Sequence, residues 1–322
     1  MTATAGEHAG RPVDAVSVDA RLAAALPIDG RTGTVHSVHA RVVNLRTPDG
    51  LLCCLASDEL DDAPRTVLIA AADWGRIGWH RDDPVRFGPA LTHAYDGTTV
   101  VLAGATPWQP SPADTSALTP DLLRHAAATV ERHLLTPAHR TPFEVASADE
   151  LGRRTTALAD AIRGDAATAV TAAAARLVGL GAGLTPSGDD LLTGLAVLAA
   201  ADGMALGRIR PALAEAVLGH APLEERTTAV SAATLTEAVA GRARQRIHDL
   251  VTALVSTGEA GTAGGVGSGG RSSLVDAVLR VRAIGHTSGA DILTGLRLGL
   301  TLEADLREAN RLAAPTHPKE NS

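Results

Sequence analysis

Aromatic residues are scarce in this 322-residue chain, and its second half has none. The six that occur lie within the first 143 residues, at Trp74, Trp79, Phe87, Tyr95, Trp108 and Phe143. The remainder is dominated by Ala, Leu, Val, Thr and Gly. This change in composition indicates two different architectures, and the length suffices for two domains with separate cores.

Basic charge and long apolar runs are also lacking. The formal net charge of -7 argues against binding to a nucleic-acid backbone, which needs a clustered basic surface. The Ala-rich run at 191–201 is too short to span a bilayer. Residues 1–18 carry charged side chains where a signal peptide would have an apolar core. We therefore expect no nucleic-acid partner, no membrane association and a cytoplasmic location.

Cysteine is nearly absent, because the only two residues, Cys53 and Cys54, are adjacent. Neighbours in sequence cannot form an ordinary structural disulfide with each other. Their apolar surroundings favour small strand residues over a redox or metal-binding role.

The first third of the chain has the pattern of β-structure. Short runs rich in β-branched residues are separated by turn signals, and they occur at 34–45, 51–56, 66–70, 84–88 and 98–102. This pattern predicts a small antiparallel sheet or barrel over 25–110. We expect residues 1–20 to be disordered. The proline-containing segment 111–118 is expected to be a linker.

Beyond the linker the apolar spacing is that of helices, which predicts a larger all-helical domain over 119–312 and an α+β fold overall. We expect helices near 120–135, 148–163, 165–178, 187–202, 211–219, 223–240, 242–256, 273–283 and 290–309. Seven glycines predict a flexible loop over 257–273. The tail at 313–322 is expected to be disordered.

One loop-to-helix element occurs twice in this helical part. Thr185–Leu195 recurs as His286–Leu296 with seven identities in eleven positions, which include Ser-Gly-x-Asp and a following Thr-Gly. Gly194 and Gly295 each cost about 1 kcal/mol relative to Ala inside a helix. This cost suggests that the two helices cross closely at these glycines. Their N-termini would then face one shared cleft.

The chemistry of such a cleft has several interpretations. Free N–H groups at two helix N-termini and at Gly181 and Gly183 suit phosphate or carboxylate. Asp189 and Asp190 would repel an anion unless they hold Mg²⁺, accept from a substrate amide or point back at their own helix. The purely structural alternative makes Thr185 or Ser187 a helix cap, with acidic residues in the first turn.

Two further polar features add candidates. His286 stands at the edge of the second copy, where an imidazole could move a proton or bind a substrate oxygen. Arg226 could clamp an anion, and Thr228 and Ser231 share a helix face. The alternatives are a loop histidine without a task and a solvated charge at a helix end. We find no Ser/His/Asp triad order or zinc spacing, which disfavours a hydrolase with a covalent nucleophile.

These interpretations define two groups of candidate residues. The candidate catalytic residues are Asp190, His286 and Asp291. The candidate substrate-binding residues are Gly181, Gly183, Thr185, Ser187, Gly188, Arg226, Thr228, Ser231, Thr287, Ser288 and Gly289. We predict no resident metal or other cofactor, with Mg²⁺ as the alternative.

The segment 181–190, together with Arg226-Thr-Thr and the Gly-His-Thr-Ser-Gly segment 285–289, resembles a bacterial family of long-unknown function. That family includes a subunit of the oxamate carbamoyltransferase of anaerobic allantoin degradation, and the likeness covers about 34–304. The resemblance implies a protein that acts with two other subunits on small amide-bearing anions. Carbamoyl phosphate and oxamate would give oxalurate and phosphate. The alternatives are a non-catalytic binding or regulatory module and a stand-alone Mg²⁺-dependent enzyme acting on a phosphorylated or ureido compound.

Overall fold

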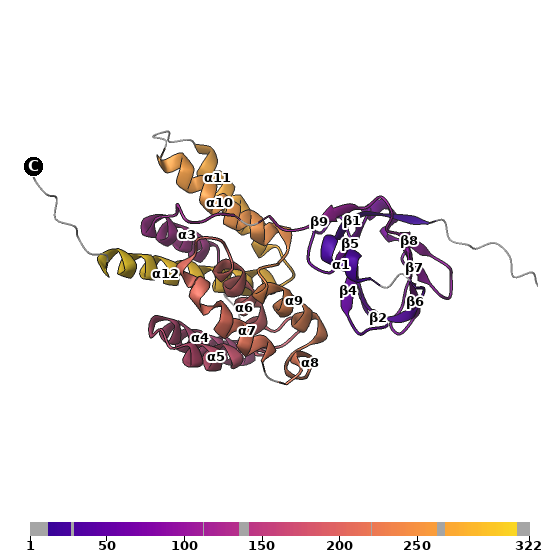
Figure 1. Cartoon of the computed structure of the whole chain (residues 1–322), viewed down its shortest axis with the longest axis horizontal. Helices are drawn as coiled ribbons and strands as arrows, with labels where there is room; N and C mark the ends of the chain where they lie inside the picture. Colours follow the sequence, from indigo (N-terminus) through magenta and orange to yellow (C-terminus); the bar gives the residue numbers. More distant parts are fainter. Residues whose placement is uncertain are drawn as a thin grey trace, which may run out of the picture. The chain divides into compact units, whose positions relative to one another are not determined.

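The protein consists of two compact units, Met1–Pro110 and Ser111–Ser322 (Figure 1). The computed structural model describes residues 12–313 except for 27–28, 112, 135–141, 220 and 263–267. The side chains at 142–146, 258–262 and 268–273 are not described. Each unit is considered by itself below.

The first unit is a β-barrel of eight strands, and a ninth strand also pairs with the first one (Figure 1). Its strands are β1 (Val13–Asp19), β2 (Thr32–His39), β3 (Val42–Arg46), β4 (Leu52–Ser57), β5 (Thr66–Ile69), β6 (Pro84–Phe87), β7 (Ala90–His93), β8 (Thr99–Val101) and β9 (Thr106–Trp108). Strand β1 closes the barrel, since it pairs with β5 on one edge and with β8 and then β9 on the other. Two short helices, α1 (Ala20–Ala25) and α2 (Ala71–Trp74), accompany the strands.

Buried and exposed side chains alternate in β2 and β6, whereas β4 and β5 are buried along almost their whole length. Val35, Leu45, Leu55 and Phe87 have essentially no exposed surface, and Trp79 is 2% exposed. This core contains aromatic side chains, which the second half of the chain lacks. The predicted barrel is thus observed. Its pairing is antiparallel except for three parallel pairs, β1 with β8, β1 with β9, and β4 with β5.

The expectation of disorder over residues 1–20 is wrong for Val13–Asp19, which form the closing strand β1. Residues 1–11 lie outside the described part of the chain. Strands β7 and β9 were also not predicted, because each contains only one β-branched residue.

A buried histidine joins the end of β7 to its neighbours in the barrel. The ring nitrogens of His93 lie 2.8 Å from Asp96 Oδ1 and 2.9 Å from Asp83 Oδ2. Trp79 stacks on the imidazole with a centroid separation of 5.3 Å, and Tyr95 meets it edge-on. These contacts fix the orientation of the His93 ring within the barrel.

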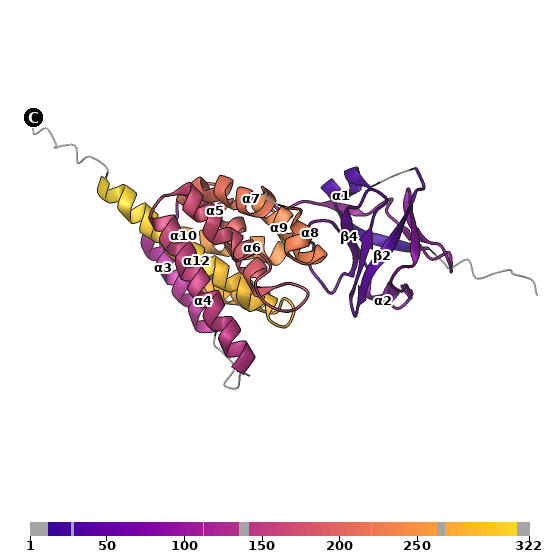
Figure 2. The same cartoon turned by 90° about the horizontal axis from the view of Figure 1, so that it is seen from below.

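The second unit is helical. It contains α3 (Pro120–His133), α4 (Pro142–Arg163), α5 (Ala167–Ala175), α6 (Ser187–Ala199), the 3₁₀ helix η1 (Ala205–Ile209), α7 (Arg210–Leu218), α8 (Leu223–Arg226), α9 (Ala229–Val239), α10 (Gln245–Thr262), α11 (Ser268–Arg282) and α12 (Ser288–Ala313). Helices α6 and α12 pack together at its centre, and α3 covers α12 (Figure 2). Nearly every residue of α6 is buried, so this helix forms the middle of the core.

Two predictions for the helices of this unit need correction. The helix expected over 223–240 is broken at Thr227 and Thr228 into α8 and α9. The glycine-rich loop is shorter than predicted, because α10 extends to Thr262 and α11 begins at Ser268. Residues 263–267 and 314–322 lie outside the described part of the chain.

The expected linker at 111–118 is fixed to the helical unit. The side chains of Thr115 and Leu118 are 0% and 5% exposed, and the Thr115 hydroxyl donates to Asp202 O at 2.7 Å. Arg307 donates to the carbonyl oxygens of Thr115, Ser116 and Leu118. In turn, the fully buried carboxylate of Glu303 accepts from Arg307 Nε at 2.6 Å. Thr115 and Leu118 therefore anchor this segment to the helical unit.

Candidate functional site

The duplicated sequence element forms a reciprocal crossing between α6 and α12. A Cβ atom at Gly194 would lie well within 3.0 Å of Ile292 O, and one at Gly295 equally close to Leu191 O. Each contact is the counterpart of the other in the repeat, so the two helices are related by a local twofold arrangement. The predicted crossing at the two glycines is observed. It needs glycine because the neighbouring atom on each side is backbone.

The loops that lead into α6 and α12 also correspond to each other. Gly181 and Gly285 both have positive φ, of 119° and 57°. A Cβ atom at Gly188 or Gly289 would overlap a carbonyl oxygen at the end of the preceding helical segment, that of Leu177 or Val281. The loops differ in length between these landmarks. Five residues separate Gly181 from the start of α6, whereas two separate Gly285 from the start of α12.

The longer first loop brings a hydroxyl across to the second copy. Thr185 Oγ1 lies 2.7 Å from Ser288 Oγ, so residues 103 positions apart share a hydrogen bond at the start of both helices. Asp190 lies beside this pair, is 3% exposed, and has an Oδ2 atom without a hydrogen-bond partner among the described residues. Asp291 is half-buried. The structure thus brings together Thr185, Asp190, Ser288 and Asp291.

The surroundings of Asp190 raise the pKa of its carboxyl group. Burial raises the pKa of Asp190 to about 7; the Thr185 and Ser288 hydroxyls oppose the rise, and the negative charges of Asp291 and Asp189 add to it. Around pH 7 this side chain is therefore divided between its acid and its carboxylate forms. A group with that pKa can donate or accept a proton at physiological pH.

Part of the predicted anion cradle is bonded within its own loops. Gly188 N donates to Leu180 O, and Asp189 N and Asp190 N both lie within hydrogen-bonding distance of Pro186 O. In the second copy, the N–H groups of 289–291 are bonded in the same way to carbonyl oxygens at 284 and 287. The N–H groups of the glycine loop at 181–185 are not among these bonded donors. The anion cradle therefore stays a prediction.

The structural alternative, a side-chain cap on α6 from Thr185 or Ser187, is not observed. The N-cap position of α6 is Pro186, and no side chain caps this helix, so neither Thr185 nor Ser187 has that role. Ser187 is the first residue of α6 and is half-buried.

Asp189 is a bridge between segments and does not cap its own helix. Its Oδ1 accepts from Gly179 N at 2.7 Å, and its Oδ2 accepts from the Thr227 hydroxyl. Burial raises the pKa of Asp189, while those two hydrogen bonds partly offset the rise. The side chain therefore fixes the beginning of the glycine loop to the break between α8 and α9. The Arg226-Thr-Thr pattern was noticed in the sequence, but it was placed inside one continuous helix over 223–240.

The group around Arg226 supports the loop. Arg226 Nη1 donates to Ala216 O at 2.9 Å and Val217 O at 3.2 Å, at the C-terminal end of α7, and its role as an anion clamp stays a prediction. Thr228 donates to Leu184 O at 2.6 Å and caps α9 by accepting from Ser231 N. The Ser231 hydroxyl is buried beside Asp189, outside hydrogen-bonding geometry.

The remaining candidates lie on the outside of the two loops. His286 and Thr287 are exposed, as are Gly181 and Gly183. No contact of the His286 ring with Asp190 or Asp291 supports its predicted catalytic role, which stays a prediction. Within the described ranges, no three His, Cys, Asp or Glu side chains are grouped as metal ligands.

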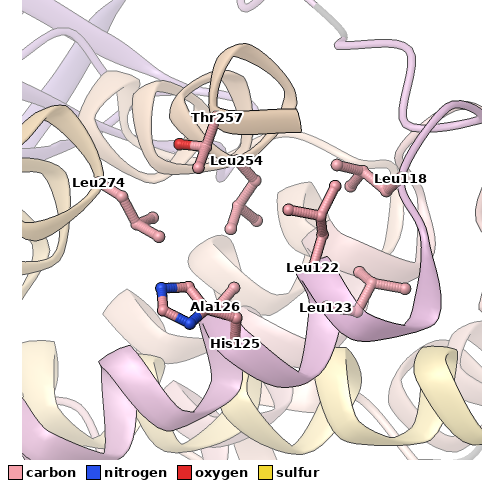
Figure 3. A pocket seen from close by; sticks show the side chains of 8 residues that line it. All are labelled: Leu118, Leu122, Leu123, His125, Ala126, Leu254, Thr257 and Leu274. Atoms are coloured by element: carbon pink, nitrogen blue, oxygen red, sulfur yellow. The ribbon is translucent and has the colours of Figure 1, made fainter. Parts of the chain in front are cut away.

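A separate apolar pocket lies between α3, α10 and α11 (Figure 3). Its walls include Leu122, Leu254 and Leu274, whose side chains point toward one another, with His125 at its border. None of its lining residues belongs to the duplicated element. In the described part of the chain, no helix is both long and apolar enough to span a membrane.

The chain thus combines a β-barrel unit with a helical unit. In the helical unit, two copies of one sequence element cross, and a carboxyl group from each copy lies near this crossing. Two family models match the chain. Residues 14–107 match the AllH family N-terminal domain, and residues 177–300 match the oxamate carbamoyltransferase subunit AllH. The chain belongs to the AllH family. No solved structure matches it.

Proposed function

We propose that this chain is a subunit of a carbamoyltransferase complex that acts with two partner subunits in the cytoplasm. In the proposed reaction the amide nitrogen of oxamate attacks the carbonyl carbon of carbamoyl phosphate. A C–N bond forms, the C–O bond to phosphate breaks, and the amide proton is transferred, which gives oxalurate and hydrogen phosphate. The family description supports the carbamoyltransferase assignment.

One observation carries the assignment of the site to the α6–α12 junction. Asp190 is a nearly fully buried carboxyl group with one oxygen unpartnered among the described residues. Leaving such an oxygen without a donor costs about 1–3 kcal/mol, and more when it is charged. A substrate N–H would satisfy it. With a pKa of about 7, Asp190 is also suited to take the proton that the amide nitrogen loses.

The test is turnover of the reconstituted complex with Asp190→Asn and Asp291→Asn chains. We expect each variant to lose about 10²–10⁴-fold in kcat, the usual contribution of a positioned acid or base. Asp305→Asn is the matched control, because Asp305 is also on α12 and forms an ion pair with Arg163 in which both side chains are exposed by more than 40%. Full turnover of both junction variants would refute this site. Equal losses in the control would show that general damage to α12 explains the effect.

A further inference from the structure

We infer that Thr228 is a positioning residue: its hydroxyl holds the loop that leads into α6, and it thereby places Thr185 at the junction. This first loop comprises residues 179–186. The inference rests on the proposed function, since it takes the junction as the reacting site. It adds to that site a residue that acts through another side chain and does not itself touch the substrate.

The first loop is tied at its beginning to the break between α8 and α9. Asp189 Oδ1 accepts from Gly179 N at 2.7 Å, and its Oδ2 accepts from the Thr227 hydroxyl. Burial raises the pKa of Asp189, and both hydrogen bonds and the positive charge of Arg226 oppose that rise. A Cβ atom at Gly179 would lie well within 3.0 Å of Arg226 O. One end of the loop is thus fixed by hydrogen bonds and by backbone packing on the end of α8.

A second attachment lies near the end of the first loop. The Thr228 hydroxyl donates to Leu184 O at 2.6 Å. This oxygen belongs to the planar peptide group that joins Leu184 to Thr185, so holding it also orients the Thr185 backbone. Thr185 Oγ1 in turn lies 2.7 Å from Ser288 Oγ at the start of α12. Thr228 therefore fixes the peptide group that immediately precedes the hydroxyl of the junction.

The second copy of the duplicated element provides an internal comparison. Its loop has two residues, instead of five, between the glycine with positive φ and the start of the helix. Ala290 stands at the position of Asp189, so this copy has no carboxylate there to form a bridge. The attachments accompany the longer loop, which is the one that carries Thr185 across to the other copy.

The break that holds the first loop is itself anchored. Arg226 Nη1 donates to Ala216 O at 2.9 Å, at the C-terminal end of α7. Thr228 caps α9 by accepting from Ser231 N at 3.1 Å. A threonine hydroxyl has one hydrogen to donate, and Thr228 uses it on Leu184 O. The same hydroxyl therefore serves as acceptor for α9 and as donor to the loop.

The carboxyl group of Asp190 responds to the position of Thr185. Burial raises the pKa of Asp190 to about 7, and the hydroxyls of Thr185 and Ser288 oppose the rise. The negative charges of Asp291 and Asp189 add to it. When the Thr185 hydroxyl moves away, the carboxylate form loses part of its stabilisation, so the pKa of Asp190 rises further. This pKa is thus a measurable signal of where the first loop lies.

The experiment is a pH titration of the full-length chain by NMR of the aspartate carboxyl carbons, with the Asp190 signal assigned by its loss in Asp190→Asn. We expect Thr228→Val to raise the pKa of Asp190 by about 0.5–1 pH unit, part of what a hydrogen bond to a charged group contributes. Thr228→Ser keeps the hydroxyl and should restore the wild-type value. Thr119→Val is the matched control, because Thr119 likewise caps a helix, α3, by accepting from Leu122 N. It should leave the pKa of Asp190 unchanged.

A double variant separates positioning from general loosening of the helical unit. Thr185→Val removes the responding hydroxyl itself, so it should raise the pKa of Asp190 at least as much as Thr228→Val does. In that background Thr228→Val should cause no further rise, because the hydroxyl through which it acts is already absent. Thr228→Ala removes the same hydroxyl with a smaller side chain and should give the same rise as valine.

An unchanged pKa of Asp190 in both Thr228→Val and Thr228→Ala would overturn the inference. An equal rise in Thr119→Val, or a full additional rise in the Thr185→Val background, would overturn it as well. Unfolding of both Thr228 variants, with Thr119→Val folded, would make Thr228 a structural residue instead.

These results do not depend on turnover, so the proposed function is tested separately. In the reconstituted complex, a higher pKa of the general base should move the acidic limb of the kcat–pH profile to higher pH. A raised pKa of Asp190 with an unmoved profile would refute Asp190 as the base, and it would leave the positioning role of Thr228 intact.

Discussion

The glycine crossing gives the sharpest test of the packing in the helical unit. A Cβ atom at Gly194 or Gly295 would overlap the carbonyl oxygen of Ile292 or Leu191, and ordinary contacts begin only at 3.4 Å. Because backbone oxygens cannot rotate away, the helices must separate by on the order of 1 Å, which opens small gaps along their contact. Overpacking of this kind costs about 1–3 kcal/mol or more, against a gain of about 1 kcal/mol in helix propensity.

The matched control is Gly152→Ala in α4, where a Cβ atom meets nothing within 4 Å. This variant should gain stability, by up to about 1 kcal/mol. For a unit of about 200 residues, each kcal/mol corresponds to about 2–4 °C in Tm. Calorimetry of the full chain should therefore show the helical transition lowered in Gly194→Ala and Gly295→Ala but raised in the control.

The double variant Gly194→Ala/Gly295→Ala adds a second criterion. Both alanines force the same separation of α6 from α12, so the second substitution should cost less than the first. Additive losses would mean that the two contacts are independent. A Tm for Gly194→Ala that rises as in Gly152→Ala would refute the crossing itself.

Three other outcomes are expected from the described contacts. Glu303→Gln removes the charge that pairs with Arg307 in the core, so it should cost about 3–5 kcal/mol in denaturant unfolding; a change below about 0.5 kcal/mol would contradict this role. Burial opposes ionisation of Asp83 and Asp96, but hydrogen bonds hold the pKa of each below its ordinary value. The contribution of these two carboxylates to the stability of the barrel should therefore be fully present above about pH 4 and should be lost as the pH falls further. The raised pKa of Asp190 has the opposite effect on the pH dependence of stability. Its contribution to the free energy of unfolding is fully present below about pH 4 and is lost as the pH rises through about 7. Asp190→Asn should remove this decrease in stability between about pH 4 and 8.

The sequence was sufficient to predict the barrel, the helical unit and the crossing. Each depends on a local pattern: alternation in the strands, helical spacing, and two helix-interior glycines whose cost requires a compensating contact. The closing strand β1 (Val13–Asp19) was missed because its pairing with β5, β8 and β9 depends on segments about 50 to 90 residues away. Closure of a barrel is a long-range property that short patterns do not record.

The candidate site was predicted in part. The repeat identified the two carboxyl groups and hydroxyls that meet, but it could not show which hydrogen bonds the loops use internally. Pro186 O and Leu180 O accept from the N–H groups of 188–190, which were among those expected to bind an anion. Asp189 has the same residue type and helix as Asp190, yet it bridges Gly179 and Thr227. Such differences follow from loop length and tertiary contacts, which residue identity alone does not specify.

The reciprocal contact of Gly194 with Ile292 and of Gly295 with Leu191 has the form of an isologous interface, in which each surface meets its own counterpart. A chain that carried a single copy of the element could complete this contact only by pairing with a second chain. Assembly would then depend on protein concentration. Joining both copies in one polypeptide makes the encounter intramolecular. It also frees the two copies to differ, as the longer first loop and Thr185 already do.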